Sequence, residues 1–259
     1  MRTVGVDLAA EARATAVAEV VWHDDGRATL ETLLLGADDE AVLEALSRAE
    51  RAAVDCPLGW PEPFAAFLQS HRMGQVQPPA GLSGLQWRRT LSRRTTDLVC
   101  EAVTGVRPLS VSADRIAAVA MRGAGLLGAL AARGQPVDRA GDGRVVECYP
   151  AAALRTWGLP HQAYKRAVGA EALGRLTTAV QQHLPGLRLG EHEALVRSSD
   201  DAFDAVVCAL VARAAALGVV AGPQDNDRQA AAVEGWIVLP TGPLANLLPA
   251  APEPGRATA

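Results

Sequence analysis

Short apolar runs separated by turn residues dominate the first part of the chain. Three runs are expected to form antiparallel strands in meander order: Thr3–Leu8, Thr15–Trp22 and Ala28–Leu35. The turn at residues 23–26, His-Asp-Asp-Gly, is typical of a hairpin. Acidic residues from Asp38 onward open a predicted helix that extends to about Arg51. A short buried strand, Ala52–Asp55, is then expected to end before Pro57.

The middle of the chain, about residues 60–143, has helical patterns and no convincing strand. Helices are predicted at Pro63–Arg72, Ser92–Thr104 and Ser112–Ala132. The segment Met73–Gly84 is rich in Pro, Gly and Gln, and we expect it to be a mobile loop. We interpret the whole region as a helical insertion.

The pattern after the insertion returns to a strand and then to helices. A strand is expected at Arg144–Tyr149, helical segments at Ala151–Leu184, and a late strand at Gly235–Leu239. The helix expected at Ser198–Leu217 is apolar on nearly all sides and should be buried. This order predicts an α/β fold: a mixed five-stranded sheet flanked by helices, in one domain over residues 1–249. The tail, 250–259, is expected to be flexible.

Composition narrows the class of protein. The 259 residues are 49% hydrophobic and carry a net charge of −4, which indicates a globular protein without a general affinity for polyanions. A local basic site remains compatible with this charge. The four cysteines form no CxxC pair, so we expect no zinc cluster or disulfide framework and a cytoplasmic location. No signal peptide, transmembrane helix or membrane partner is expected, and no particular oligomeric state is indicated.

Acidic residues recur where predicted strands end and where the buried helix begins. Asp7 lies within an apolar strand, Asp55 and Glu147 end two others, and Asp201 and Asp204 begin the helix. Ligands of α/β proteins gather at the carboxyl ends of strands. We therefore predict a catalytic site with bound Mg²⁺ or Mn²⁺, whose ligands are Asp7, Asp55 and Asp204. Two such ions about 4 Å apart can support phosphodiester cleavage.

Each carboxylate also has a structural interpretation. Asp55 can be a turn residue, Glu147 an exposed strand end, and Asp201 a complement to the helix N-terminus. Asp204 lies a turn further into an apolar helix, and Asp7 has apolar neighbours. A bare charge is unfavourable in such surroundings, so these two residues carry the metal hypothesis best.

Seven short segments, in this order, resemble a known family: VGVDLA, VDCPLG, RRTTD, ECYPAA, YK, SSDDAFDA and EGWIVLP. The family is domain of unknown function 429, described as predicted nucleases with the RNase H fold, and the resemblance covers about Val4 to Pro240. It implies the order βββ-α-β-α-β-α, with catalytic acids at Asp7, at Asp55 and at the pair Asp201 and Asp204. Glu147 belongs to the family's own motif, and the large insertion departs from a minimal RNase H domain.

A basic cluster inside the insertion is the candidate substrate-binding surface. It contains Arg88, Arg89, Arg93 and Arg94, next to Trp87. Arginine forks suit phosphates, and a tryptophan can stack on a base. The alternative is a solvated helix face on which Arg94 pairs with Asp97.

Lys165 is the single lysine among 25 basic residues. Because a lysine is compact and its pKa responds to burial, we predict that it reaches the carboxylates as a catalytic residue, pairing with Glu147 or with a substrate phosphate. The alternative is an exposed lysine on a helix.

These features favour a metal-dependent nuclease or phosphodiesterase that acts on DNA or RNA. The main alternative is an actin-like or sugar-kinase-like nucleotide-binding module. It is disfavoured because Asp7 is followed by Leu8-Ala9-Ala10, where such modules place Gly and Ser or Thr against phosphate. A binding protein without catalytic activity is a third class, against which the intact carboxylates argue weakly.

Overall fold

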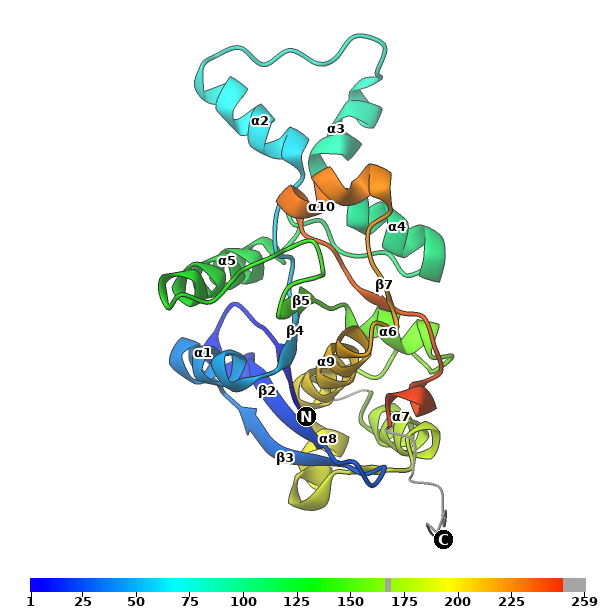
Figure 1. The fold of residues 1–259 in the computed structure, drawn as a ribbon. Coiled ribbons are helices and arrows are strands. Elements are labelled where there is room, and N and C mark those ends of the chain that lie inside the picture. Colours follow the sequence, from blue (N-terminus) through cyan, green and yellow to red (C-terminus); the bar gives the residue numbers. More distant parts are fainter. Residues whose placement is uncertain (166–168, 249–259) are drawn as a thin grey trace, which may run out of the picture.

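The structure, a computed structural model, describes residues 1–165 and 169–248. Its centre is a mixed six-stranded sheet with the strand order β5-β4-β1-β2-β3-β6, flanked by ten α-helices within the described residues (Figure 1). The predicted α/β class is therefore confirmed, whereas the predicted number of five strands is wrong. The tail predicted to be flexible, 250–259, lies outside the described residues.

The first half of the sheet has the predicted order. An antiparallel meander is formed by β1 (Arg2–Asp7), β2 (Ala16–Trp22) and β3 (Ala28–Leu35). Helix α1 (Asp39–Arg48) begins where the Asp38 side chain accepts a hydrogen bond from the Ala41 N–H. Strand β4 (Arg51–Asp55) then pairs in parallel with β1.

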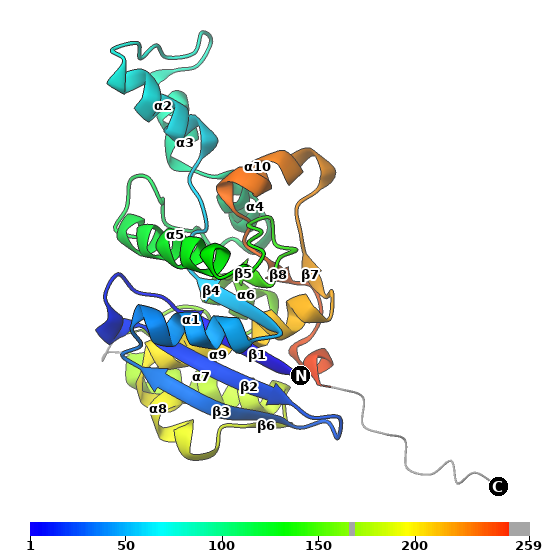
Figure 2. The same cartoon turned by 60° about the vertical axis from the view of Figure 1, so that its left-hand side comes forward.

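Four helices lie between β4 and β5: α2 (Glu62–Arg72), α3 (Gly84–Ser92), α4 (Thr95–Thr104) and α5 (Ala117–Ala132). Helices α2 and α3 form a hairpin that projects from the rest of the molecule (Figures 1 and 2), and neither has a buried residue. We call this hairpin, residues 61–93, the arm. Helix α3 is missing from the prediction; it begins at a capping box of Ser83 and Gln86.

The remaining elements complete the sheet and cover it: β5 (Val145–Glu147), α6 (Pro150–Thr156), α7 (Ala170–His183), β6 (Leu187–Arg188), α8 (Glu193–Ser198), α9 (Asp200–Ala216), β7 (Val220–Ala221), α10 (Arg228–Glu234) and β8 (Leu239–Pro240). Strand β6 is the sixth strand and pairs with β3; two residues are too few to give a periodic signal. The strand predicted at Gly235–Leu239 is wrong in extent, because Ile237 makes one isolated bridge and Leu239 begins β8, which pairs with β7.

Helices cover both faces of the sheet (Figure 2). On one face, α9 packs against β1, β2 and β4, and most of its residues are buried, as predicted. On the other face, α1 and α5 share an apolar cluster with Val4, Val6 and Val54 of the strands. The four cysteines are buried free thiols. No helix in the described residues combines the length and the low polarity needed to cross a membrane.

Candidate metal centre

Two aspartates lie side by side at the ends of neighbouring parallel strands. In the register of β1 with β4, Asp7 is opposite Asp55. Side chains alternate between the two faces of a strand, so Asp7 shares a face with Gly5, and Asp55 shares one with Ala53. Both Gly5 and Ala53 lie on the side covered by α9. The carboxyl groups of the two strands therefore point to the same layer.

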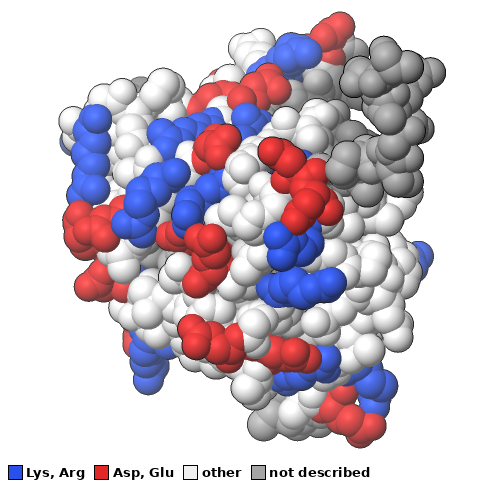
Figure 3. Space-filling model, turned by 60° about the horizontal axis from the view of Figure 1, so that its bottom comes forward, with Lys and Arg blue, Asp and Glu red and all other residues white. Residues whose placement is uncertain are grey.

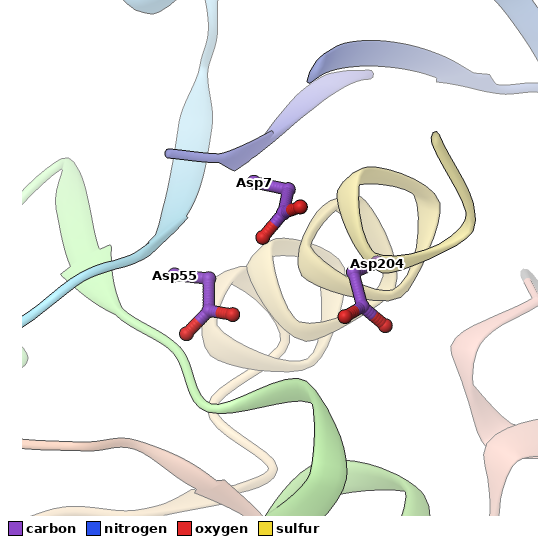
Figure 4. A group of neighbouring side chains, drawn as sticks. All are labelled: Asp7, Asp55 and Asp204. Carbon is purple, nitrogen blue, oxygen red and sulfur yellow. The ribbon is translucent and has the colours of Figure 1, made fainter. Parts of the chain in front are cut away.

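Helix α9 supplies the third carboxylate because it lies unusually close to β1. A Cβ atom at Gly5 would be 2.0 Å from the carbonyl oxygen of Ala205 and 2.2 Å from the nitrogen of Ala209, so a side chain there would push the helix away. With glycine, the fully buried Asp204 reaches the strand ends. Carboxylate oxygens of Asp7, Asp55 and Asp204 all lie within 4.8 Å of one another (Figure 4), as the sequence predicts.

Burial and repulsion oppose ionisation of these groups. Burial raises the pKa of Asp7 well above its ordinary value, and the charges of Asp204 and Asp55 raise it further. Burial also raises the pKa of Asp55 to about 7, although the charge of Lys165 acts in the opposite direction. The pKa of Asp204 is raised by burial against the same lysine. Three carboxylates this close ionise together only when a cation compensates them.

Asp204 has two partners in the loop after α6. The Tyr164 hydroxyl donates a hydrogen bond of 2.8 Å to Asp204 Oδ1, and Lys165 Nζ lies 2.5 Å from Oδ2. Burial alone would lower the pKa of Lys165, but the charges of Asp204, Asp55 and Asp7 outweigh it and raise that pKa. Lys165 thus reaches the carboxylates, as predicted, but it pairs with Asp204 and not with Glu147.

The donor set suits a divalent cation. Asp204 Oδ2 is buried, and its partner within the described residues is the ammonium group of Lys165, whose side chain is 52% exposed. One ammonium group compensates one carboxylate, so ionisation of the other two so close together is unfavourable unless a further cation meets them. Carboxylate oxygens are the ligands that Mg²⁺ and Mn²⁺ prefer. Asp7, Asp55 and Asp204 can therefore hold a metal ion.

Glu147 does not join this group, because the pleat of the sheet directs it elsewhere. Its register partner in β4 is Val54, one residue before Asp55, so Glu147 shares the face of Val54 and not that of Asp55. Its carboxylate is buried and receives two hydrogen bonds from Arg94, of 2.6 and 2.8 Å, and one of 2.9 Å from the Leu58 N–H. Its position is that of a structural ion pair, and it is not an exposed strand end.

The four arginines predicted to bind substrate do not form one exposed cluster. Arg94 is 1% exposed and pairs with both Glu147 and Asp97, which is the structural alternative stated above. Arg93 is largely covered and lies 2.7 Å from Glu101. Arg88 and Arg89 are exposed on α3 of the arm. The prediction of a single basic surface fails because the chain turns between α3 and α4, which separates the two arginine pairs.

Asp201 lies at the margin of the candidate centre. It is half-buried in the first turn of α9, where the Ser199 side chain accepts a hydrogen bond from the Ala202 N–H. Burial raises the pKa of Asp201, and the charge of Asp200 adds to this. Both interpretations therefore apply: Asp201 begins the helix, and its charge contributes to the raised pKa of Asp7.

Tyr164 is the site residue that sequence reasoning misses. It is 2% exposed, and its hydroxyl orients Asp204. The available signal is its position directly before Lys165, the single lysine of the chain. The residues between positions 165 and 169 are outside the described part of the chain.

The fold and the carboxylate cluster define an α/β protein with a site that can hold a metal ion. The chain belongs to the family described as Protein of unknown function (DUF429), which matches residues 5–228, and the resemblance noted from short segments is thereby confirmed. The matched range includes all three aspartates and Lys165. No curated protein and no solved structure matches the chain.

Proposed function

We propose that this protein is a metal-dependent phosphodiester hydrolase that cleaves nucleic acid, with an RNase H-like fold and Mg²⁺ or Mn²⁺ at the three aspartates. The observation that carries the proposal is the convergence of Asp7, Asp55 and Asp204 within 4.8 Å on two strand ends and a buried helix. The meander, helix and parallel fourth strand support the fold, because the resemblance implies the same order.

The site residues have distinct roles in such a reaction. Asp7, Asp55 and Asp204 would hold the metal ion, which, when bound, activates water and stabilises the leaving oxygen. Tyr164 fixes Asp204 through Oδ1, and Oδ2 lies beside the ammonium group of Lys165. The ammonium group of Lys165 is adjacent and half exposed, so it binds the substrate phosphate at the mouth of the site.

The arm is suited to hold the rest of a nucleic acid. The chain leaves β4 at Asp55 and enters α2 at Glu62, so the arm arises at the same edge of the sheet as the carboxylates. No acidic residue occurs in the sequence from 63 to 96. The exposed Arg72, Arg88 and Arg89 make no ion pair within the described residues. Such arginines attract phosphates.

Other parts of the surface have a different charge pattern. Figure 3 shows the face that is brought forward when the bottom of Figure 1 is turned toward the viewer. On this face, acidic and basic side chains are interspersed among uncharged ones. Alternating charges do not attract a polyanion. The arm is therefore the surface we assign to substrate binding.

A cleavage assay tests the proposal. Labelled single-stranded and duplex oligonucleotides of DNA and RNA are incubated with the full chain and Mn²⁺ or Mg²⁺, with a chelator as the negative control. We expect cleavage that needs the metal and that falls in Asp204→Asn by more than about 100-fold, beyond the loss typical of an outer-shell substitution. The matched control is Asp24→Asn, an exposed turn residue far along the sheet from the cluster, and it should retain activity.

Two results would contradict the proposal. One is the absence of metal-dependent cleavage for every oligonucleotide; the other is an Asp204→Asn variant as active as the wild type. Binding of ATP with a rise in melting temperature, and no cleavage, would favour the nucleotide-binding alternative. The arm is tested separately: replacing Arg88 and Arg89 with alanine should reduce the salt dependence of oligonucleotide affinity by about one unit of slope per arginine.

A further inference from the structure

A cavity of about 420 Å³ opens beside the carboxylates. Asp55 and Lys165 form one edge of it. The apolar part of its lining comes from four separate segments: Pro108, Leu109, Ile116, Tyr149, Ala151 and Ile237. This volume is within the range of about 300–1,000 Å³ that is typical of small-molecule sites. We call it the Tyr149 pocket.

Two other charged groups in the lining of the pocket already compensate each other. Arg94 and Glu147 line it, but each is nearly fully buried and satisfied by the other. The charge available to a ligand is therefore at the edge, where the Lys165 side chain is 52% exposed. His161 and Gln162 add polar groups next to that lysine. The pocket thus has an available charge at Lys165, while Arg94 and Glu147 in its lining are paired with each other.

We infer that the Tyr149 pocket binds one nucleoside of the substrate, directly next to the phosphate that reacts at the three aspartates. This inference rests on the proposed function and adds the substrate class to it. A phosphate at the Lys165 edge places its uncharged substituent in the apolar interior. A base is a flat ring with polar edges, and the Tyr149 ring supplies the kind of surface on which bases stack.

Binding of a base in the Tyr149 pocket determines whether the substrate is single-stranded or duplex nucleic acid. A base inside the pocket is enclosed by loops of the protein and cannot remain paired with a second strand. Unpairing a base in an intact duplex is unfavourable, and it is least so at a mismatch or in a single strand. The substrate class is therefore single-stranded nucleic acid or an unpaired end, and intact duplex is a poor substrate.

Calorimetry tests the pocket without relying on cleavage. The four nucleoside 5′-monophosphates, phenyl phosphate and inorganic phosphate are titrated into the full chain with Mn²⁺ present. At least one nucleotide should bind about tenfold more tightly than inorganic phosphate or phenyl phosphate, the discrimination that one apolar pocket provides. Two variants should remove this preference and leave the affinity for inorganic phosphate unchanged. Leu109→Asn makes the wall polar, and Ala151→Trp fills the cavity.

Leu34→Asn is the matched control. Leu34 is 42% exposed and Leu109 is 44% exposed, but Leu34 lies on β3 outside the pocket. This variant should bind nucleotides as the wild type does. The two pocket variants differ in position and chemistry, and melting curves show whether each of them is folded. One folded pocket variant is sufficient for the comparison with Leu34→Asn and the wild type.

The possible outcomes separate the pocket from the reaction. Nucleotides that bind no more tightly than inorganic phosphate overturn the inference, and so does a preference that survives both pocket substitutions. Phenyl phosphate that binds as tightly as every nucleotide also overturns it, because the pocket would then accept any ring. If nucleotide preference follows the pocket variants but no oligonucleotide is cleaved, the pocket stands and the proposed hydrolase activity fails. Preferential cleavage of duplex over single strands would contradict the inference.

Discussion

Two groups of charged side chains lie on opposite faces of the same sheet edge, one buried and the other only partly buried, and they are compensated very differently. In the first, Arg94 donates hydrogen bonds to Asp97, to Glu147 and to the carbonyl oxygen of Glu234. Glu147 receives a further hydrogen bond from the Leu58 N–H. In the second, three aspartates face one lysine whose side chain is 52% exposed.

The pKa values follow this difference. Burial alone would lower the pKa of Arg94, but the charges of Glu147 and Asp97 raise it above its ordinary value. In the aspartate group, burial raises the pKa of Asp7 and Asp55 and the neighbouring carboxylates add to the effect. A cluster in which every buried charge has a partner fits a structural role, whereas carboxylates that outnumber their cations are a place where a ligand can bind. Sequence reasoning placed Glu147 in the second group, and the structure places it in the first.

The largest expected effect is on the compensated cluster. Arg94→Met leaves the buried carboxylates of Asp97 and Glu147 without their cation, which should lower the free energy of unfolding by about 3–5 kcal/mol. Arg93→Met is the matched control: its partner Glu101 is partly exposed, so the loss should be about 0–1 kcal/mol. Urea unfolding of both variants at neutral pH measures the difference. Equal losses would mean that Arg94 has no special structural role.

The next effect is on the uncompensated cluster. Asp7→Asn removes one metal ligand together with a repelling charge, so the protein should stay folded while Mn²⁺ affinity falls by more than about 100-fold, beyond the loss typical of an outer-shell substitution. Calorimetric titration with Mn²⁺ measures the affinity, and circular dichroism checks the fold. Glu147→Gln should leave Mn²⁺ affinity within a few-fold of wild type, provided that the variant is folded. Unchanged affinity in Asp7→Asn would remove this residue from the ligand set.

Several members of the two charged clusters can be predicted from the sequence, but the strand register that separates the clusters cannot. Asp7 and Asp204 are recognisable because each is a charge among apolar residues, and strand ends in α/β proteins converge. Whether Asp55 or Glu147 shares a face with Asp7 depends on a shift of one residue in strand pairing, which reverses the side chain's direction. Neither hydrophobic pattern nor spacing specifies that shift.

Other differences have equally local causes. Strand β6 consists of Leu187 and Arg188, which is too short for any alternation to be visible. The arginine pairs look continuous in sequence, but α3 ends at Ser92 and α4 begins at Thr95, so Arg94 turns inward while Arg88 remains exposed. Such turns are decided by tertiary packing. The core meander and helix α9, in contrast, depend on long apolar patterns, which single sequences report well.

The pH dependence of stability gives a further test of the aspartate cluster. The pKa of Asp55 is about 7 in the folded protein against 3.8 for an ordinary aspartate. Between these values the unfolded chain has lost the proton that the folded chain keeps, so without metal the stability should fall as pH rises through this window and level off above it. The expected loss exceeds about 1 kcal/mol, since one unit of pKa corresponds to about 1.4 kcal/mol.

The test compares unfolding at pH 5 and pH 8 for wild type and Asp55→Asn. The variant lacks the titrating group, so its stability should depend less on pH. Saturating Mg²⁺ should cancel the loss at pH 8 in the wild type, because a cation bound to the folded state compensates the carboxylates there. An identical pH dependence in both proteins would show that Asp55 is ionised throughout.

The smallest expected effect concerns Lys165, which pairs with the aspartate cluster within the described residues. Its Nζ lies 2.5 Å from Asp204 Oδ2, so a metal ion bound at the aspartates has a positive neighbour. Lys165→Ala removes that repulsion and should tighten Mn²⁺ binding by at least about fivefold, because even two unit charges 4 Å apart in water repel by about 1 kcal/mol. Lys165→Arg keeps the charge and should leave Mn²⁺ affinity near the wild-type value.

If the lysine instead supported metal binding by orienting Asp204, Lys165→Ala would weaken Mn²⁺ affinity. The sign of the change in affinity decides between the two roles. The cleavage rate should fall in both variants, whatever their Mn²⁺ affinity. Alanine cannot bind the phosphate, and the guanidinium group is wider than the ammonium group that it replaces.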